Sequence, residues 1–269
     1  MKRRSFLTSS IAASAFAASA SSGYLLGGQG SGAGKRPEYY ELRRYRLLRG
    51  PQVKLAHDFF QQTLAPALNR LGIGPVGIFD VEIGPESPAV YVLMPCVSLE
   101  TLVNVESRLD RDAEYLKAGA AFLNAPAQQP AYVRMESSLM VAFEGMPRLK
   151  VPPATAEHRA RIFELRTYES PTPQDHLRKV EMFNKGEFQV FDKAGLWQVF
   201  YGDTLIGSRL PNLTYMLCFE DFADRSKKWE AFRSAPEWKT LSSSPRYAFE
   251  EIVSNITNVI LTPAPYSQI

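Results

Sequence analysis

A seven-residue stretch that occurs twice constrains the fold of this chain more than any other feature. Residues 39–45 have the sequence Tyr-Tyr-Glu-Leu-Arg-Arg-Tyr, and residues 162–168, 123 positions further on, have the sequence Ile-Phe-Glu-Leu-Arg-Thr-Tyr. If each copy forms a β-strand, its Glu, Arg and Tyr share one face and the intervening residues share the other, because side chains alternate along a strand. The repetition predicts two copies of one structural unit.

The rest of each copy predicts the same order of elements. We expect strands near residues 38–46, 76–83, 89–96 and 131–143 in the first copy and near 161–169, 196–201, 213–219 and 252–261 in the second. A long helix follows each opening strand and ends at Gly72 or Gly195, which are also 123 positions apart. Pro66 should kink the first of these helices or split it in two. A later helix is expected near residues 111–123. Each copy is therefore strand–helix–strand–strand–helix–strand, the pattern of ferredoxin-like folds.

These elements divide the chain into four parts. Residues 1–34 would hold an export signal and a flexible linker, and residues 35–148 the first repeat. Residues 149–160 would form a proline-containing linker, and residues 161–269 the second repeat. We expect a chain of the α+β class.

The first residues resemble a twin-arginine export signal. Arg3 and Arg4 precede Ser-Phe-Leu and a weakly apolar Ala/Ser run, and residues 18–20 (Ala-Ser-Ala) offer a cleavage site. The apolar run at 11–20 is too short for a stable transmembrane helix, so no stable membrane insertion is expected after the signal is removed. An uncleaved anchor is the alternative. The resemblance implies a periplasmic or otherwise exported protein.

The net charge gives no indication of a nucleic-acid partner. The formal charge of +3 is matched by Lys2, Arg3 and Arg4, the only charged residues before Lys35. Without its leader the chain is close to neutral. It then has neither the basic field that attracts nucleic acid nor a polybasic run for anionic lipid.

The two cysteines, Cys96 and Cys218, lie at nearly matching places in the two copies. A disulfide could form in an oxidising compartment. Unpaired cysteine, however, behaves as a small hydrophobic residue and is usually buried. We expect two free, buried thiols.

Three segments of the second copy resemble the NIPSNAP family: residues 164–168, residues 209–217, and residues 229–238 with the pattern Trp-x-x-Phe-x-x-x-Pro-Glu-Trp. The first copy resembles the family more weakly and lacks the Arg-Leu-Pro-Asn element of residues 209–212. The resemblance implies two NIPSNAP domains in tandem. It also implies the dimeric α/β-barrel architecture, in which two ferredoxin-like sheets face one another across a cavity. Proteins of this architecture include cofactor-free monooxygenases and haem-binding enzymes, but a shared fold does not define a function.

In such a barrel, we expect the strand face that carries Leu165 to pack on helices and the opposite face to line the cavity. An unpaired charge there would cost roughly 3–5 kcal/mol, so each Glu–Arg pair should neutralise itself. The pairs could be purely structural, or the Arg and Tyr side chains could bind a carboxylate, a phenolate or a similar polar ligand. The residues expected to face the cavity are Glu41, Arg43, Tyr45, Glu164, Arg166 and Tyr168.

His176 lies in the first turn of the long helix of the second copy. It could act as a base at the rim of the cavity, with Glu164 as the alternative proton carrier, although a solvated helix histidine is the simpler interpretation. Its distance along the chain from His57 and His158 gives no metal-ligand spacing, and the cysteines add none. We therefore predict no metal and no cofactor, including haem, because no histidine is well placed as an axial ligand.

Aromatic and loop residues of the second copy supply further candidates. Trp197, Phe200 and Tyr201 share one expected strand and could form an aromatic wall of the cavity, although aromatic strand residues usually belong to a core. Arg209 and Asn212 flank a proline turn before a strand. Loop residues at such an edge often bind ligands, or Asn212 could simply satisfy the turn.

Two classes of function remain open. The first is a small-molecule binding protein or cofactor-independent enzyme, in which Arg166 and Tyr168 hold the ligand and His176 or Glu164 handles a proton. The second is a non-enzymatic interaction or scaffold protein, and a homo-oligomer is compatible with either class. An enclosed pocket with Arg166 and Tyr168 inside it would favour ligand binding, whereas an interior filled with side chains would favour a scaffold.

Overall fold

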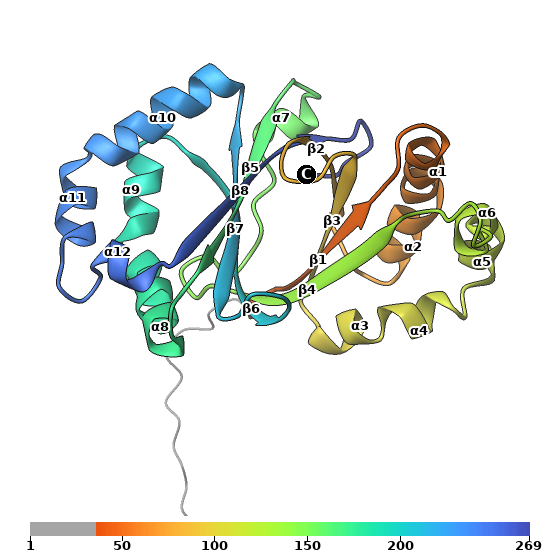
Figure 1. Cartoon of the computed structure of the whole chain (residues 1–269), viewed down its shortest axis with the longest axis horizontal. Helices are drawn as coiled ribbons and strands as arrows, with labels where there is room; N and C mark the ends of the chain where they lie inside the picture. The colour runs from red at the N-terminus through yellow and green to blue at the C-terminus, as the bar shows by residue number, and fades with distance from the viewer. Residues whose placement is uncertain (1–35) are drawn as a thin grey trace, which may run out of the picture. The chain divides into compact units, whose positions relative to one another are not determined.

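Eight strands close into one barrel between two groups of helices (Figure 1). The computed structural model describes residues 36–269, so the predicted export signal and its linker lie outside the described residues. Every neighbouring pair of strands is antiparallel, and the order around the barrel is β1-β3-β2-β8-β5-β7-β6-β4. The strands are β1 (Tyr39–Arg46), β2 (Gly77–Ile83), β3 (Ala89–Cys96), β4 (Arg134–Ala142), β5 (Ile162–Glu169), β6 (Trp197–Ile206), β7 (Asn212–Phe219) and β8 (Asn255–Pro263).

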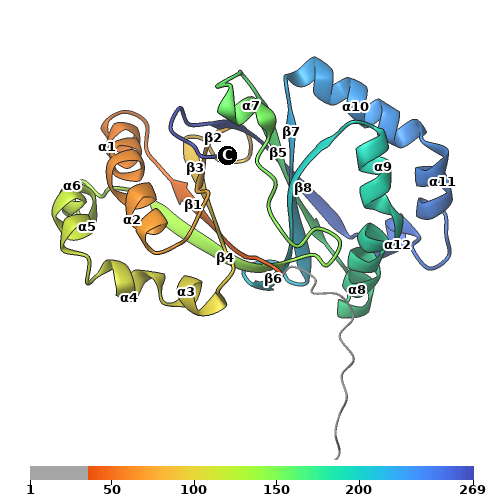
Figure 2. The same ribbon diagram turned by 180° about the vertical axis from the view of Figure 1, so that it is seen from behind.

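The helices of the two repeats lie on opposite sides of the barrel, as both views show (Figures 1 and 2). Those of the first repeat are α1 (Pro51–Phe59), the π-helical segment η1 (Phe60–Leu64), α2 (Ala65–Arg70), α3 (Leu99–Val103), α4 (Val105–Leu109), α5 (Ala113–Ala118) and α6 (Ala120–Leu123). Those of the second are α8 (Pro173–Met182), the π-helical segment η2 (Phe183–Glu187), α9 (Phe188–Lys193), α10 (Phe222–Ser234), α11 (Pro236–Ser242) and α12 (Phe249–Ile252), and the short α7 (Pro153–Ala156) lies in the linker. None of the helices within residues 36–269 is long and apolar enough to cross a membrane.

The expected fold class and the order of elements in each repeat are confirmed. Several elements differ from the prediction in their extent, and β4 begins at Arg134 rather than near residue 131. β6 runs on to Ile206, the last strand begins at Asn255 because α12 occupies the residues before it, and the helix expected at 111–123 is divided into α5 and α6.

The long helix after each opening strand contains a π-helical segment. In the first repeat this segment, η1, ends just before Ala65-Pro66, and the proline cannot donate the backbone hydrogen bond that a regular α-helix needs there. The second repeat has η2 at the corresponding place without a proline. Both helices end at the predicted glycines, since Gly72 and Gly195 have φ angles of 74° and 75°.

The closing strand of each repeat pairs with the other repeat. β4 pairs with β1 of its own repeat and with β6, and β8 pairs with β5 of its own repeat and with β2. The barrel is therefore closed by pairing between the edge strands of the two repeats, which we call the exchanged strands. Neither repeat forms a complete ring of strands by itself.

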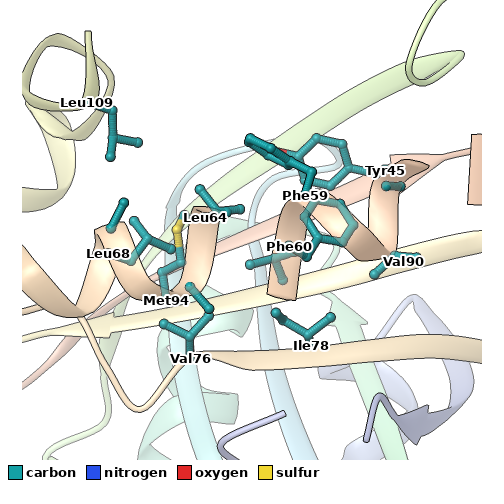
Figure 3. Close-up of a cluster of buried hydrophobic side chains, with 14 of the residues drawn as sticks. Tyr45, Phe59, Phe60, Leu64, Leu68, Val76, Ile78, Val90, Met94 and Leu109 are labelled. Atoms are coloured by element: carbon teal, nitrogen blue, oxygen red, sulfur yellow. The ribbon is translucent and has the colours of Figure 1, made fainter. Parts of the chain in front are cut away.

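Buried apolar side chains form three clusters. One lies between the first repeat's strands and its helices and includes Tyr45, Phe60 and Met94 (Figure 3). A second occupies the same place in the second repeat. The third lies inside the barrel and draws residues from both repeats. Cys96 and Cys218 are free and buried, as predicted.

Candidate functional site

The strand faces that line the barrel interior are the opposite of those expected. Leu42 of β1 and Leu165 of β5 lie in the interior cluster, whereas Tyr45 and Tyr168 belong to the two clusters under the helices. The prediction that the Glu-Arg-Tyr rows face the cavity is therefore wrong. Both faces of these strands are covered, one by the opposite wall of the barrel and one by helices. The residues placed on the outer, helix-facing side are Glu41, Arg43, Tyr45, Glu164, Arg166 and Tyr168.

The expected Glu–Arg pairs are nevertheless formed on that outer face. Arg166 Nη1 donates to Glu164 Oε1 at 2.8 Å, and Arg43 Nε donates to Glu41 Oε1 at 2.6 Å. Arg166 also donates through Nη2 to the hydroxyl of Tyr168 at 3.0 Å. These rows attach the sheet to the helices above it.

The barrel interior is filled at one end. Large apolar side chains occupy that end, and Ile269 inserts among them with no exposed surface. Phe79 and Phe163 pack edge to face there, with ring centroids 4.9 Å apart. No ligand can enter from this end without displacing side chains.

The other end of the barrel holds a pocket of about 1030 Å³, which we call the mouth pocket. Both hairpin turns, residues 84–88 between β2 and β3 and residues 207–211 between β6 and β7, lie at this end. Leu42, Leu165 and Val259 line its apolar part. The volume of the pocket is at the upper limit of the range typical of small-molecule sites.

One wall of the mouth pocket is charged. Arg44 forms ion pairs with Glu136 and Glu86, and its partner across the β1–β3 ladder is Tyr91. Burial raises the pKa of Tyr91, although the charge of Arg44 acts in the opposite direction. This wall presents a neutral phenol beside a guanidinium that is held by two carboxylates.

The opposite wall carries hydroxyl and amide groups. Thr167 and Thr214 are ladder partners and share a hydrogen bond of 2.9 Å between their hydroxyls, and Thr257 is the partner of Thr167 on its other side. Arg209 lies above them with its side chain about half exposed, 3.4 Å from Glu169 Oε1 and 3.3 Å from Thr257 Oγ1. Of the two arginines that line the pocket, Arg209 is more exposed than Arg44 and is more loosely held by its ion pair.

Asn212 lines the same pocket but is almost fully buried. Its Nδ2 donates to the carbonyls of Ser208 and Arg209, and its Oδ1 accepts a hydrogen bond from Thr204. Asn212 therefore satisfies the turn, the structural alternative considered from the sequence. It positions Arg209 at the mouth.

His176 is buried, so the interpretation as a solvated helix histidine is wrong. Its Nε2 lies 2.7 Å from Asp203 Oδ1, and its Nδ1 has no hydrogen-bond partner among the described residues. The first repeat has a matching contact, because His57 Nε2 lies 3.0 Å from Asp80, 123 positions before Asp203. The hydrogen bond to Asp80 raises the pKa of His57. Neither histidine lines the mouth pocket, and His176 and Glu164 form no contact with each other.

The three aromatic residues expected on one wall are separated. A β-bulge between Gln198 and Phe200 changes the register of β6 against β7. Phe200 lies inside the barrel, Tyr201 lies under the helices, and Trp197 is partly exposed. Phe200 and Tyr201 are neighbours in sequence and lie on opposite faces by alternation alone, whereas the bulge, which reverses the faces that follow it, separates Tyr201 from Trp197. No metal site is apparent in the described part of the chain, where no three His, Cys, Asp or Glu side chains converge.

Sequence reasoning missed most residues of the mouth pocket. Arg44, Tyr91, Glu136, Thr167, Thr214 and Thr257 were not singled out. One signal was available. The strand face that begins Tyr40, Leu42 changes from apolar to charged at Arg44, and the matching face of the second copy changes from Leu165 to Thr167. A face that becomes polar toward one end is expected of a barrel that is filled at one end and open at the other.

Comparison with known proteins agrees with this fold. Two solved structures with a similar fold are each described as that of a candidate monooxygenase. The protein from Lactobacillus acidophilus NCFM has 7% identity and a TM-score of 0.53, covering 84% of this chain and 94% of its own. The protein from Fusobacterium nucleatum has 8% identity and a TM-score of 0.54, covering 85% and 93%. An uncharacterised NIPSNAP-like domain protein from Burkholderia xenovorans has 21% identity and a TM-score of 0.35, covering 39% and 85%. No curated protein matches the sequence.

The closed barrel and its mouth pocket define an α/β-barrel protein built from two fused ferredoxin-like repeats. The NIPSNAP family model matches residues 40–146 and again residues 163–268. The chain belongs to the NIPSNAP family and carries two of its domains in tandem.

Proposed function

We propose that the mouth pocket binds a small polar or aromatic molecule. The observation that carries this proposal is the uneven filling of the barrel, which is packed with apolar side chains at one end and hollow at the other. A purely structural barrel would gain stability by filling both ends, because empty space inside a protein forfeits van der Waals contacts.

The lining of the pocket indicates the chemistry of the ligand. Leu42, Leu165 and Val259 would contact an apolar ring or chain, and the threonine hydroxyls would accept or donate hydrogen bonds. Arg209 would meet an acidic or phenolic group, because its guanidinium lies 3.4 Å from Glu169 and 3.3 Å from Thr257, at the long end of hydrogen-bonding distance. The two arginines and two glutamates of the lining balance, so the ligand need not carry a large net charge.

The experiment is native mass spectrometry of the purified full chain to detect a retained small molecule. Replacing Thr167 with phenylalanine fills the pocket, and Arg209→Gln removes the loosely held cation. Arg70→Gln is the matched control, since Arg70 is a surface arginine outside the pocket that pairs with Asp112 and Glu114. We expect occupancy to fall in the first two variants and to persist in the control. Retention of the same molecule at the same occupancy in Thr167→Phe would contradict the proposal.

The molecule bound in the mouth pocket could also be a substrate that the protein converts. The two fold neighbours are described as candidate monooxygenases, so oxygen consumption with the retained molecule is the reaction to measure first. In this pocket a proton would pass to the carboxylate of Glu86 or Glu136 or come from the phenol of Tyr91, rather than involve His176 or Glu164, which lie outside it. Binding without oxygen uptake would contradict an oxygen-consuming reaction with that molecule.

We also propose that the protein is exported, on the strength of the leader sequence alone. Replacing Arg3 and Arg4 together with lysine should block a twin-arginine route, because that route reads the arginine pair. The measurement is cell fractionation of the parent and the double variant in a host that has the pathway. Equal export of both proteins would contradict this proposal.

The second candidate function is protein interaction. Ile83 and Ile206 occupy equivalent positions of the two repeats, 123 residues apart, at the ends of β2 and β6, and both are more than half exposed. Exposed apolar side chains at repeated positions are compatible with a docking surface or a homo-oligomer. Loss of a higher-order species in the double variant Ile83→Asp and Ile206→Asp, measured by light scattering, would favour this candidate.

A further inference from the structure

The Arg-Tyr row of the second repeat lines a second pocket, outside the barrel. This outer pocket has a volume of about 360 Å³ and lies between β5 and β8 on one side and α10 and α11 on the other. It shares no lining residue with the mouth pocket. Its principal lining residues are Arg166, Tyr168, Arg225, Trp229, Phe232 and Trp238.

The outer pocket contains one more positive charge than negative charge. Glu164 accepts hydrogen bonds from Arg166 at 2.8 Å and from Arg225 at 2.9 and 2.6 Å. One carboxylate is thus shared by two guanidinium groups, both of which stay charged. The buried Lys179 beneath them is neutralised by Glu187, at 2.5 Å, and adds no net charge.

Other charged groups nearby do not remove the excess. Arg233, at the rim, pairs with Glu230 at 2.9 Å, and both side chains are exposed. The side chain of Arg166 is only 12% exposed, so water screens its charge poorly. A partly buried site with an excess cation favours a bound anion.

The first repeat holds the same motif with the opposite charge. Arg43 is shared by Glu41, at 2.6 Å, and Glu106, at 2.7 Å. Glu106 occupies the position 123 residues before Trp229, and the residue 123 before Arg225 is Leu102. The fold therefore holds a Glu-Arg row in place without a second arginine. The first repeat builds its row with one arginine, whereas the second repeat adds Arg225.

The remaining walls of the outer pocket are aromatic. The guanidinium carbon of Arg166 lies 4.6 Å from the ring centroid of Trp229. The rings of Phe232 and Trp238 are 4.6 Å apart, and those of Trp229 and Phe232 are 5.4 Å apart. These walls offer flat apolar surfaces beside the cations, and the volume suits a ligand with a single ring.

We propose that the outer pocket binds a small planar monoanion, an aromatic carboxylate of single-ring size. Its carboxylate would bind Arg225 and Arg166, and its ring would lie against Trp229 and Phe232. This site is independent of the one proposed at the mouth.

The test is a titration of the full chain with benzoate, followed by tryptophan fluorescence. Two of the three tryptophans, Trp229 and Trp238, line the outer pocket, and replacing the third, Trp197, with phenylalanine leaves a signal from the pocket alone. Benzamide, which has nearly the same shape but no charge, is the matched neutral probe. We expect a saturable response to benzoate that weakens with added salt, and a response to benzamide that is at least about tenfold weaker.

Arg225→Leu locates the binding. It removes the excess cation and two of the four hydrogen bonds to Glu164, which stays paired with Arg166 and Trp229, and circular dichroism checks that the variant is folded. We expect benzoate to bind this variant at least about tenfold more weakly than the parent. Arg178→Leu, which removes an exposed arginine of α8 that pairs with Asp175, should bind like the parent.

The outcomes separate the two proposed sites. Thr167→Phe fills the mouth pocket and should leave the response to benzoate unchanged. Equal benzoate binding by Arg225→Leu and the parent would overturn the proposal, as would equal responses to benzoate and benzamide. No saturable response up to about 20 mM benzoate, a concentration above the Kd of weak millimolar ligands, would overturn it as well.

Discussion

At the residue scale, Glu164 is a central hydrogen-bond acceptor on the outer face of β5. It is fully buried and accepts four hydrogen bonds, from Arg166, from two nitrogens of Arg225 and from Trp229. Burial alone would raise the pKa of Glu164, but the hydrogen bonds from Arg225 and Trp229 and the charge of Arg166 outweigh it and lower the pKa. Glu164 therefore attaches β5 to α10 as a carboxylate.

Glu164→Gln should destabilise the fold strongly. The substitution leaves Arg166 and Arg225 without their shared carboxylate, and breaking a buried ion pair costs about 3–5 kcal/mol. Glu41→Gln is the matched control and should cost less, because Arg43 keeps its contact with Glu106. The measurement is the free energy of unfolding in urea. Equal losses of unfolding free energy in the two variants would contradict the expectation that Glu164, shared by two arginines, stabilises the fold more than Glu41 does.

The acid sensitivity of the fold should depend on the same group. Because the folded-state pKa of Glu164 lies below its usual value of 4.5, its stabilising contribution is present above that value and is lost as the pH falls through the folded-state pKa. The difference in unfolding free energy between the parent and Glu164→Gln should therefore shrink on acidification below about pH 4.5. A difference that stays constant across this range would contradict the assignment.

The residue scale is also where prediction from sequence failed. Alternation correctly grouped Glu164 with Arg166 and Tyr168, and the pairing of Glu with Arg was correct. Alternation does not say which face is inside when both faces are buried, and in β5 the apolar Leu165 faces the barrel interior. The information lies in α10, whose Arg225 and Trp229 supply donors for Glu164. That contact spans more than 60 residues and has no signature in the strand itself.

At the element scale, prediction was more successful. The strands, the long helices and their terminal glycines follow from local sequence, because turn residues and helix ends are determined by nearby residues. The β6 bulge and the π-helical segment η2 were not predictable in this way. Both depend on how the element packs against the rest of the barrel.

Gly195→Ala should lower the unfolding free energy by about 1–2 kcal/mol, because Gly195 has a φ of 75° and other residues avoid this conformation. The nearest atom that a new Cβ would meet is Lys228 Cε at 3.8 Å, so the loss would come from the backbone rather than from a clash. Gly195→Asn is the control and should lose less, since asparagine tolerates positive φ. Thermal unfolding measures both variants, and an alanine variant as stable as the parent would contradict the expectation.

At the scale of the whole molecule, strand pairs between the two repeats close the barrel. β4 needs β6 and β8 needs β2, so each repeat alone would expose unpaired strand edges. The sequence predicted two facing repeats from the copied motif. It did not show which strands cross between them, because pairing across more than 60 residues leaves no local pattern.

The two repeats, produced as separate polypeptides divided within the linker at 149–160, should associate one to one when mixed. Each alone should aggregate or pair with itself, because its edge strands lack their partners. Light scattering of each polypeptide and of the mixture measures this. A stable monomer with cooperative unfolding from either repeat alone would contradict the role of the exchanged strands.

Because the two repeats belong to one polypeptide, their residues at equivalent positions can differ. In a pair of identical subunits every substitution appears twice, so an arginine on one wall is always opposed by the same arginine on the other. Here Arg44 has Thr167 at the equivalent position, Tyr91 has Thr214, and Glu86 has Arg209. A barrel formed by one polypeptide can therefore present different side chains on its two walls and hold an asymmetric ligand in one orientation. A dimer of identical subunits presents the same side chains on both walls.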